Sequence, residues 1–358
     1  MNNFKNKVAV GLSGGVDSSV AAMILQEQGY DVIGVTMEIF SGDASTYKVK
    51  QNACYGPDEK EDIELAEKLC HKLGIEHYVI DLRKEYQKNV LDYFTSEYAE
   101  GRTPNPCVKC NWKMKFGAMV DELRKQIEID YFATGHYARI EKDENTNRYL
   151  LKKAKDLVKD QTYFLYNLSQ KQLSRTLFPL GNLEKRQVKQ MAAKLELDLE
   201  HKKESQNFIS GGHDSLLKAG ANKGSIKDKH GKIIGEHRGI QLYTIGQRKG
   251  LGISSVEPLY VTKIIKKENV IVVGSKADLL HNHCQANHLN WIFSKELKET
   301  FTATAKIRYV QDEHEANIVP LGEDLIGVDF YSPQMAITPG QSIVFYKKDV
   351  CLGGGIIV

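Results

Sequence analysis

An apolar run, a glycine–serine loop and a helix-like stretch open this chain, in the order VAVGLSGGVDSSVAAMIL from Val8 to Leu25. The run predicts a buried strand, and DSSVAAMILQEQG predicts a helix that ends at Gly29. Further strand-like and helix-like segments alternate up to about residue 205. Alternation at this spacing predicts an α/β fold, a doubly wound parallel sheet with helices on both faces.

Three segments with polar or flexible residues fall where predicted strands end. The glycine loop follows the first strand, Met37 lies near the end of the second, and Gly135 and His136 follow a later one. Sheets of this class bind ligands beyond the carboxyl ends of their strands. We therefore expect the three segments to converge on one site.

The residue composition and the pattern of apolar segments change after about residue 205. SGGHDSLLKAGANKGSIKDKHGKIIGEHRG is rich in Gly, Lys and His, and past Leu259 short apolar segments alternate with polar turns. The second pattern predicts a small β-barrel or sandwich at the C-terminus. We expect three domains: an α/β domain over 1–205, a small central domain over 206–274 and a β-barrel over 275–358.

The lack of long apolar runs and of a signal-peptide core predicts a reducing compartment. The chain has no run of 18 or more apolar residues, and its start, MNNFKNKVAV, has no signal-peptide core. We therefore expect a cytoplasmic protein with no membrane partner. The formal charge of +3 does not by itself indicate nucleic acid. Among six cysteines in such a compartment, a close pair indicates metal binding or catalysis.

The loop GLSGGVDSS lacks both the Gly-Lys-Ser/Thr ending of a Walker loop and the GxGxxG of a dinucleotide fold. Its glycines allow close approach to an anion, and the helix start offers unpaired N–H groups. Asp17 can orient a Mg²⁺ ion. The alternative is a Gly-Ser turn before an ordinary helix cap. The order strand–SGGVDS–helix resembles the PP-loop of ATP pyrophosphatases, which adenylate a substrate and release pyrophosphate.

The segment GRTPNPCVKCNWKMKFG carries Cys107 and Cys110 in CxxC spacing before a lysine-rich helix. We expect the helix dipole and Lys109, Lys113 and Lys115 to lower the pKa of Cys110 and favour its thiolate. Such a thiolate can act as a nucleophile, a persulfide carrier or an iron ligand. Half of a structural zinc site is the alternative, but the sequence has no second CxxC.

Together the motifs resemble one family, the tRNA-specific 2-thiouridylases, over nearly the whole chain. The matching motifs are GLSGGVDSSVAA, GRTPNPCVKCN, FATGHYARI, KDQTYFLYNLSQ, FPLGNLEK, HRGIQLYTIGQRKGLGI, PLYV, IRYV and the terminal LGGG. This family uses ATP to replace the C2 oxygen of the wobble uridine of certain tRNAs by sulfur. The resemblance implies an adenine nucleotide alpha hydrolase-like fold, a central tRNA-binding domain and a C-terminal β-barrel.

The resemblance also implies roles for single residues. The catalytic set is Cys110 as nucleophile, with Cys107 and Asp17. The ATP site takes Gly11, Leu12, Ser13, Gly14, Gly15, Val16, Asp17, Ser18, Met37 and Gly135. The tRNA contacts are Asn105, Pro106, Cys107, His136, Lys159, Asp160, Gln161, Arg308, Tyr309 and Gln341. Taken without the family, Met37 also fits core packing, and His136 also fits a structural role.

The chain departs from the family where most members carry a second cysteine, in a segment resembling ESQxxCFI. Here the segment is KKESQNFISGGHD, around Ser205 and Gln206, and it has no cysteine. The two-cysteine relay of the family therefore cannot be carried over. We favour Cys54, Cys107 and Cys110 as ligands of three irons of a [4Fe–4S] cluster, whose fourth iron holds hydrosulfide. The alternative is a persulfide on one of the CxxC pair, resolved by the other cysteine as a disulfide.

The predicted reaction starts from ATP and Mg²⁺ at the glycine loop. The uridine C2 oxygen attacks the α-phosphate and pyrophosphate leaves. Sulfur held by Cys110 or by a cluster attacks C2, and AMP leaves, giving 2-thiouridine. The sulfur comes from a carrier protein or from free sulfide. Two alternatives are a small-molecule synthetase of the argininosuccinate-synthetase type and an RNA-binding protein that uses ATP as a switch, although neither needs the CxxC pair.

Overall fold

The computed structural model describes residues 5–42, 53–195, 207–210, 212, 214–217 and 220–358. The chain divides into two compact units. The first contains Met1–Val90, Cys107–Gly212 and Lys348–Leu352, and the second contains Leu91–Pro106, His213–Lys347 and Gly353–Val358. The three-domain division stays a prediction. The motif residues Ser205 and Gln206 lie outside the described residues.

A five-stranded parallel sheet forms the centre of the first unit. Its strands are β1 (Lys7–Gly11), β2 (Asp31–Glu38), β4 (His77–Asp81), β5 (Tyr131–Thr134) and β8 (Thr176–Leu177), in the order β4-β2-β1-β5-β8. Val8, Ala9 and Val10 of β1 are completely buried, as expected for a central strand covered on both faces. The strand order reverses between β1 and β5, which is where such sheets bind ligands.

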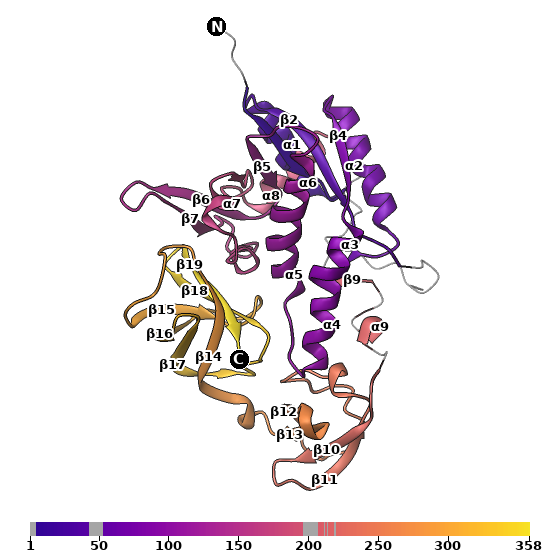
Figure 1. Cartoon of the computed structure of the whole chain (residues 1–358), viewed down its shortest axis with the longest axis vertical. Helices are drawn as coiled ribbons and strands as arrows, with labels where there is room; N and C mark the ends of the chain where they lie inside the picture. The colour runs from indigo at the N-terminus through magenta and orange to yellow at the C-terminus, as the bar shows by residue number, and fades with distance from the viewer. Residues whose placement is uncertain (1–4, 43–52, 196–206, 211, 213, 218–219) are drawn as a thin grey trace. The chain divides into compact units, whose positions relative to one another are not determined.

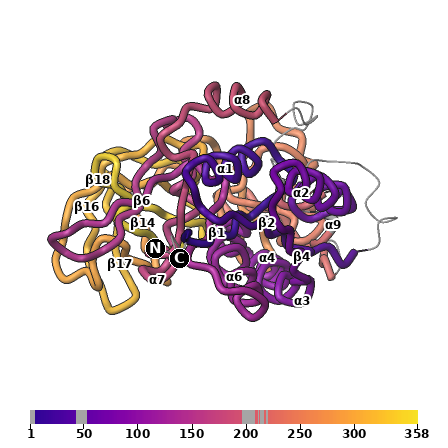
Figure 2. Tube along the Cα trace, turned by 90° about the horizontal axis from the view of Figure 1, so that it is seen from above, coloured from indigo at the N-terminus to yellow at the C-terminus, as the bar shows by residue number. Residues whose placement is uncertain are grey.

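Helices cover both faces of this sheet. α1 (Val16–Glu27), α2 (Glu59–Leu73) and α8 (Lys185–Ala193) lie on one side, and α3 (Arg83–Tyr86) and α6 (Met119–Leu123) lie on the other (Figures 1 and 2). α2 begins with acidic residues and ends at Gly74, whose φ of 66° is left-handed, and both features stabilise helix ends. The predicted doubly wound fold is confirmed.

The helix that carries the CxxC pair is irregular. It begins as α5 (Pro106–Lys109), continues as a π-helix over Cys110–Ala118 and ends as α6. Nε2 of Gln172 donates hydrogen bonds to the carbonyl oxygens of Trp112 and Phe116, at 3.1 and 2.9 Å, and so stabilises this π-helical turn. π-Helical turns are rare in proteins, and many of those that do occur lie at functional sites.

Short elements complete the first unit. They are β3 (Ala53–Tyr55), β6 (Ala138–Asp143), β7 (Arg148–Lys153), the 3₁₀ turn Thr162–Phe164, α7 (Gln170–Leu173) and β9 (Asn207–Ile209). β3 pairs in parallel with β9, so two segments far apart in the sequence lie side by side. β6 and β7 form a hairpin, and β7 also pairs with Val350 and Cys351 at the start of β19.

The second unit contains a small sheet and a barrel. β10 (Gly224–Asp228), β11 (Ile233–His237), β12 (Tyr260–Ile265) and β13 (Val270–Gly274) form a sheet in the order β11-β10-β13-β12. The barrel consists of β14 (Leu280–Trp291), β15 (Phe301–Lys306), β16 (His314–Gly322), β17 (Leu325–Met335), β18 (Ser342–Lys347) and β19 (Val350–Ile357). β14 pairs with both β17 and β19, which closes the six strands (Figure 1). The predicted C-terminal β-barrel is therefore confirmed.

Two short helices of the second unit are α4 (Asp92–Ala99) and α9 (Asp214–Leu217). Within the described ranges, no helix has the length and apolar character needed to cross a bilayer.

Candidate active site

The glycine loop joins the central strand β1 to α1. Gly14 adopts a left-handed φ of 64°, which glycine tolerates best. The hydroxyl of Ser18 accepts a hydrogen bond from the N–H of Ser13 at 3.3 Å and donates to the carbonyl of Gly15 at 3.1 Å. The hydroxyl of Ser19 donates to the same carbonyl at 2.9 Å. The loop is thus held by its own side chains at the start of a twelve-residue helix, where N–H groups and the dipole favour an anion.

The end of β5 lies directly against this loop. A Cβ atom at Gly135 would lie 2.7 Å from backbone atoms of Asp17 and Ser18, so a side chain does not fit there. Met37, half-buried, lies two residues past Val35, the strand partner of Gly11. The structure therefore brings the three expected segments to one edge of the sheet, while their contacts with ATP stay predictions.

Asp17 is part of an ion pair that the sequence did not predict. Nζ of Lys185 lies 2.8 Å from both oxygens of the Asp17 carboxylate, and the hydroxyl of Tyr137 donates to Oδ1 at 3.0 Å. Both side chains of the ion pair are largely shielded from solvent. Lys185 ends the motif FPLGNLEK and Tyr137 lies in FATGHYARI, so the sequence signal was available in both motifs.

Cys54, Cys107 and Cys110 lie close enough for their charges to interact. The charge of Cys54 acts on both other thiols, and all three cysteines help to raise the pKa of Tyr86, after the larger effect of its burial. Tyr86 stacks on Tyr55, with ring centroids 5.5 Å apart and planes 3° from parallel. Sequence alone could not show that Cys54 lies near enough to the CxxC pair for its charge to act on both thiols; that the three cysteines form one site stays a prediction.

Strand pairing between β3 and β9 fixes the position of Cys54 in the fold. In the β3–β9 ladder, Ala53 is opposite Asn207 and Tyr55 is opposite Ile209. Asn207 directly precedes Phe208 and Ile209, where the resembling family segment has its cysteine before Phe-Ile. The strand that carries Cys54 therefore lies beside the segment from which that cysteine is absent.

The expected low pKa of Cys110 is wrong for the protein without ligands. Burial raises the pKa of Cys107 to about 12 and that of Cys110 to about 11, and the charge of Lys115 opposes this only in part. The helix begins at Pro106, one turn before Cys110, so its dipole is weaker at that thiol. Lys109 and Lys113 pack on the Trp112 ring, with Nζ 5.2 and 3.7 Å from its centroid. Both thiols are therefore protonated at neutral pH.

The three cysteines are not arranged as the ligands of a single metal ion. Among the described residues, no group of three or more His, Cys, Asp or Glu side chains is arranged to hold one metal ion. In an iron–sulfur cluster each cysteine binds a different iron, so the sulfur atoms lie farther apart than the ligands of one ion. A metal also deprotonates a coordinating thiol, whatever its free pKa. Cys54, Cys107 and Cys110, three thiols from two segments, are of the donor type that such a cluster uses.

The residues of the first unit that we expect to contact tRNA form hydrogen bonds within its loops. Nδ1 of His136 lies 2.7 Å from the Thr134 hydroxyl oxygen, and burial keeps the pKa of His136 well below its usual range, so the ring is neutral. The Asp160 carboxylate accepts from the Ala154 N–H at 2.9 Å and the Thr162 hydroxyl at 2.6 Å. Oε1 of Gln161 accepts from the N–H of Tyr137 at 2.9 Å. Their contacts with tRNA, and that of Lys159, stay predictions.

The expected contacts of the second unit also support its backbone. Nε2 of Gln341 donates to the carbonyls of Thr103 and Pro104 at 2.9 and 3.1 Å, which holds the chain just before Asn105 and Pro106. Nη2 of Arg308 donates to the Thr338 hydroxyl at 2.7 Å and to the carbonyls of Ile245 and Ala336 at 3.2 and 3.1 Å. Nζ of Lys306 lies 5.5 Å from the Tyr309 ring centre. Their contacts with tRNA also stay predictions.

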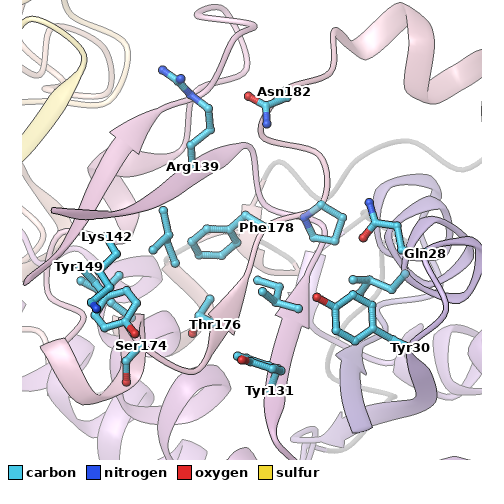
Figure 3. Close-up of a pocket in the computed structure, with 15 residues that line it drawn as sticks. Gln28, Tyr30, Tyr131, Arg139, Lys142, Tyr149, Ser174, Thr176, Phe178 and Asn182 are labelled. Atoms are coloured by element: carbon cyan, nitrogen blue, oxygen red, sulfur yellow. The ribbon is translucent and has the colours of Figure 1, made fainter. Parts of the chain in front are cut away.

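A cavity of about 400 Å³ lies elsewhere in the first unit. Tyr30 and Tyr131, whose rings are 6.4 Å apart, mark it at the amino ends of β2 and β5 (Figure 3). The glycine loop lies at the opposite ends of these strands, so this cavity is separate from the candidate active site.

Comparisons with known proteins agree with this geometry. Residues 6–210 match the family model described as tRNA methyl transferase HUP domain, 216–275 its PRC-barrel domain, and 281–357 an aminomethyltransferase beta-barrel domain. The fold and site thus define a tRNA-modifying enzyme family built on a HUP domain.

Curated relatives of full length identify the family more closely. The tRNA-specific 2-thiouridylase MnmA of Endomicrobium trichonymphae is 48% identical over 98% of this chain and 99% of its own. MnmA 2 of Thermoanaerobacter sp. (strain X514) is 48% identical over 98% of both chains, and MnmA 2 of Clostridium tetani is 46% identical over 100% of both. This chain belongs to the tRNA-specific 2-thiouridylase family, as the motifs predicted, and not to the small-molecule synthetases or ATP-switched RNA-binding proteins considered above.

Proposed function

We propose that this chain is a cytoplasmic, ATP-dependent tRNA 2-thiouridylase in which Cys54, Cys107 and Cys110 together hold the sulfur site. The observation that carries this proposal is that the unit with the glycine loop contains all three free thiols, with Cys54 near enough for its charge to act on Cys107 and Cys110. Free cysteines throughout the chain agree with a reducing compartment.

ATP is the substrate of the first half of the proposed reaction. Backbone N–H groups of residues 14–18, at the start of α1, bind its phosphates, where helix dipole and N–H groups stabilise the developing charge. The uridine C2 oxygen attacks the α-phosphorus, the bond to pyrophosphate breaks, and an adenylated oxygen remains on C2. Adenylation is needed because a carbonyl oxygen of this kind is otherwise a very poor leaving group.

Lys185 and Asp17 have linked roles in this half-reaction. The Asp17 carboxylate is already neutralised by Lys185, so a Mg²⁺ ion would have to displace that ammonium group. We propose that Lys185 turns to the phosphates when ATP binds and leaves Asp17 to the ion. Tyr137, which also contacts Asp17, keeps the carboxylate oriented during the exchange.

Sulfur enters in the second half of the proposed reaction. A sulfur nucleophile attacks C2, the C2–O bond breaks, and AMP leaves with the oxygen. Cys107 and Cys110, protonated at neutral pH, are poor nucleophiles as free thiols, which argues against a simple persulfide relay. Cys54, Cys107 and Cys110 would hold a cluster, which would supply an iron able to bind hydrosulfide. Free sulfide or a carrier protein is the source.

Iron and acid-labile sulfide measured per chain, in protein purified without oxygen, test the proposed cluster. We expect about four of each in the wild type. Cys54→Ala should lower both to near zero, as should Cys107→Ala. Cys284→Ala is the matched control, because this buried cysteine lies on β14 of the barrel, and it should keep the metal. Full iron in Cys54→Ala, or an iron-free wild type that thiolates tRNA, would show that the cluster proposal is wrong.

A further inference from the structure

A second cavity, of about 250 Å³, lies beside the helix that carries the CxxC pair. It is enclosed by the helical stretch up to Arg124, by Phe132 of β5 and by the segment from Ser169 to Thr176 around α7. Its apolar walls are Trp112, Phe116, Val120 and Phe132, and its charged lining residues are Asp121, Arg124, Lys171 and Arg175. None of these charged residues has a part in the active site described above.

Hydrogen bonds hold the two walls of this pocket in a defined arrangement. Gln172 links α7 to the π-helix through its bonds to the carbonyls of Trp112 and Phe116. The same side chain forms a capping box with Ser169, whose hydroxyl accepts from the Gln172 N–H at 3.2 Å. Lys171 and Arg175 lie on either side of this fixed residue, so the basic groups are presented by a built site rather than by a loose loop.

Arg124, one of the residues that line the pocket, has an unfilled hydrogen-bonding group. Its Nη2 atom is buried and has no hydrogen-bond partner within the part of the chain that the structure describes. Burial lowers the pKa of Arg124, and the nearby charge of Arg175 lowers it further. The charge of Asp121 raises this pKa, but its effect is the smallest of the three. A buried guanidinium nitrogen without an acceptor lowers the stability of the folded protein, and so does the repulsion between two neighbouring arginines. An oxyanion bound between the two arginines would accept the hydrogen bond and offset the repulsion.

The surroundings of the pocket favour RNA as the source of that oxyanion. Trp112 lines the pocket, and Lys109 and Lys113 lie over its ring, so basic and aromatic side chains lie together beside the pocket. Basic side chains around aromatic rings suit a nucleic-acid strand, whose phosphates and bases need both. Arg124 lies 14 residues after Cys110, roughly 20 Å along a helix, so the phosphate is outside the target nucleotide.

We propose that Arg124 and Arg175, with Lys171 at the side, form a pocket that binds one backbone phosphate of the tRNA substrate away from the wobble uridine. This inference rests on the proposed function for its ligand. It adds a contact that fixes the position of the tRNA on the first unit. Phosphate contacts of this type set register without reading sequence.

The test compares tRNA binding by Arg124→Gln and Arg175→Gln with that of Lys125→Gln. Lys125 is the matched control because it follows Arg124, is exposed and pairs with Glu122 at 2.6 Å. Dissociation constants are measured over a series of salt concentrations. Each arginine variant should bind tRNA roughly tenfold or more weakly and lose about one phosphate from the salt dependence. The control should behave as the wild type, and ATP binding should be unchanged in all three, which shows that the glycine loop is intact.

Three outcomes would overturn the proposal. The first is an unchanged salt dependence in both arginine variants. The second is inorganic phosphate that raises the thermal stability of the wild type but not of Arg124→Gln, with tRNA affinity unchanged, because the pocket would then take a small free anion. The third is normal tRNA affinity with thiolation lost only when a carrier protein supplies sulfur. A wild type that binds tRNA but does not thiolate it would instead refute the proposed function and leave this comparison readable.

Discussion

The glycine loop and the cysteine site are built in different ways, although both belong to the first unit. Residues 11–19 form the loop by themselves: the strand ends, Gly14 turns, and Ser18 and Ser19 close the turn on Gly15. The proposed cysteine site would need two distant segments, because Cys54 comes from β3 and the CxxC pair from the irregular helix. A local site can form from neighbouring residues, whereas the cysteine site exists only when the tertiary structure is complete.

The two sites also differ in how ready they are without ligands. The loop backbone offers N–H groups and a helix dipole that are in place before a phosphate binds, and the one change proposed there is the turn of the Lys185 side chain. The CxxC pair is held in a neutral form, because burial raises the pKa of Cys107 to about 12 and that of Cys110 to about 11. We infer that ATP binds to a ready site, and that sulfur chemistry starts only when a ligand changes the state of the thiols.

The largest effect that separates the two sites is expected from Cys110→Ser. The variant keeps size and polarity but removes the sulfur, so thiolation should fall by about a thousandfold or more. Release of pyrophosphate from ATP in the presence of tRNA should continue, because the glycine loop is untouched. Thiolated nucleoside is measured after digestion of the tRNA, and pyrophosphate in the same reaction. Loss of both activities together would show that the two sites are not independent.

This contrast also explains what the sequence could and could not predict. The glycine loop was predictable because its strand, turn and helix are consecutive, and the sheet followed from the alternation of strands and helices. The place of Cys54 was not, because it depends on the β3–β9 pairing across the sequence. The charge state of Cys110 was misjudged because lysine spacing is visible in a sequence and burial is not. The motif FPLGNLEK marks Lys185, but its pairing with Asp17, 168 positions away, depends on the tertiary structure.

Alkylation of the metal-free protein tests the neutral state of the CxxC thiols. A pKa raised from 9.0 to about 11 leaves roughly a hundredfold less thiolate at neutral pH. Cys110 should therefore react about a hundredfold more slowly with iodoacetamide at pH 7 than a free cysteine peptide. Its rate should rise about tenfold per pH unit up to pH 10, because only the thiolate reacts.

Peptide mapping by mass spectrometry gives the rate for each cysteine in one sample. Unfolded protein in denaturant is the control, and there Cys107 and Cys110 should react as ordinary thiols. Fast alkylation of Cys110 at pH 7 in the folded protein would mean that its thiol is already activated, and the persulfide route would then be preferred over the cluster.

The smallest of the three effects is expected from Lys185→Met, which changes the ready site alone. In the free protein the substitution leaves the Asp17 carboxylate with only the Tyr137 hydroxyl as a partner among the contacts described above, and in the complex it removes a cation from the phosphates. A charge-assisted hydrogen bond of this kind corresponds to roughly a tenfold to hundredfold change in ATP affinity. Iron content should stay at the wild-type level, because the three cysteines are unaffected.

Lys155→Met is the matched control for Lys185→Met, since Lys155 is an exposed lysine of the same unit, 3.9 Å from Glu184. ATP affinity is measured by equilibrium binding with and without Mg²⁺. If Lys185 moves to the phosphates, the variant should lose affinity in both conditions, because Mg²⁺ cannot replace a lysine that contacts phosphate directly. If Lys185 only neutralises Asp17, Mg²⁺ should restore the affinity, since the ion then takes over that role. Restoration of ATP affinity by Mg²⁺ would mean that Lys185 acts only in the ligand-free loop, where it neutralises Asp17. The two sites would then differ even more: the loop would need only a cation at Asp17, whereas the cysteine site would need a ligand on three thiols.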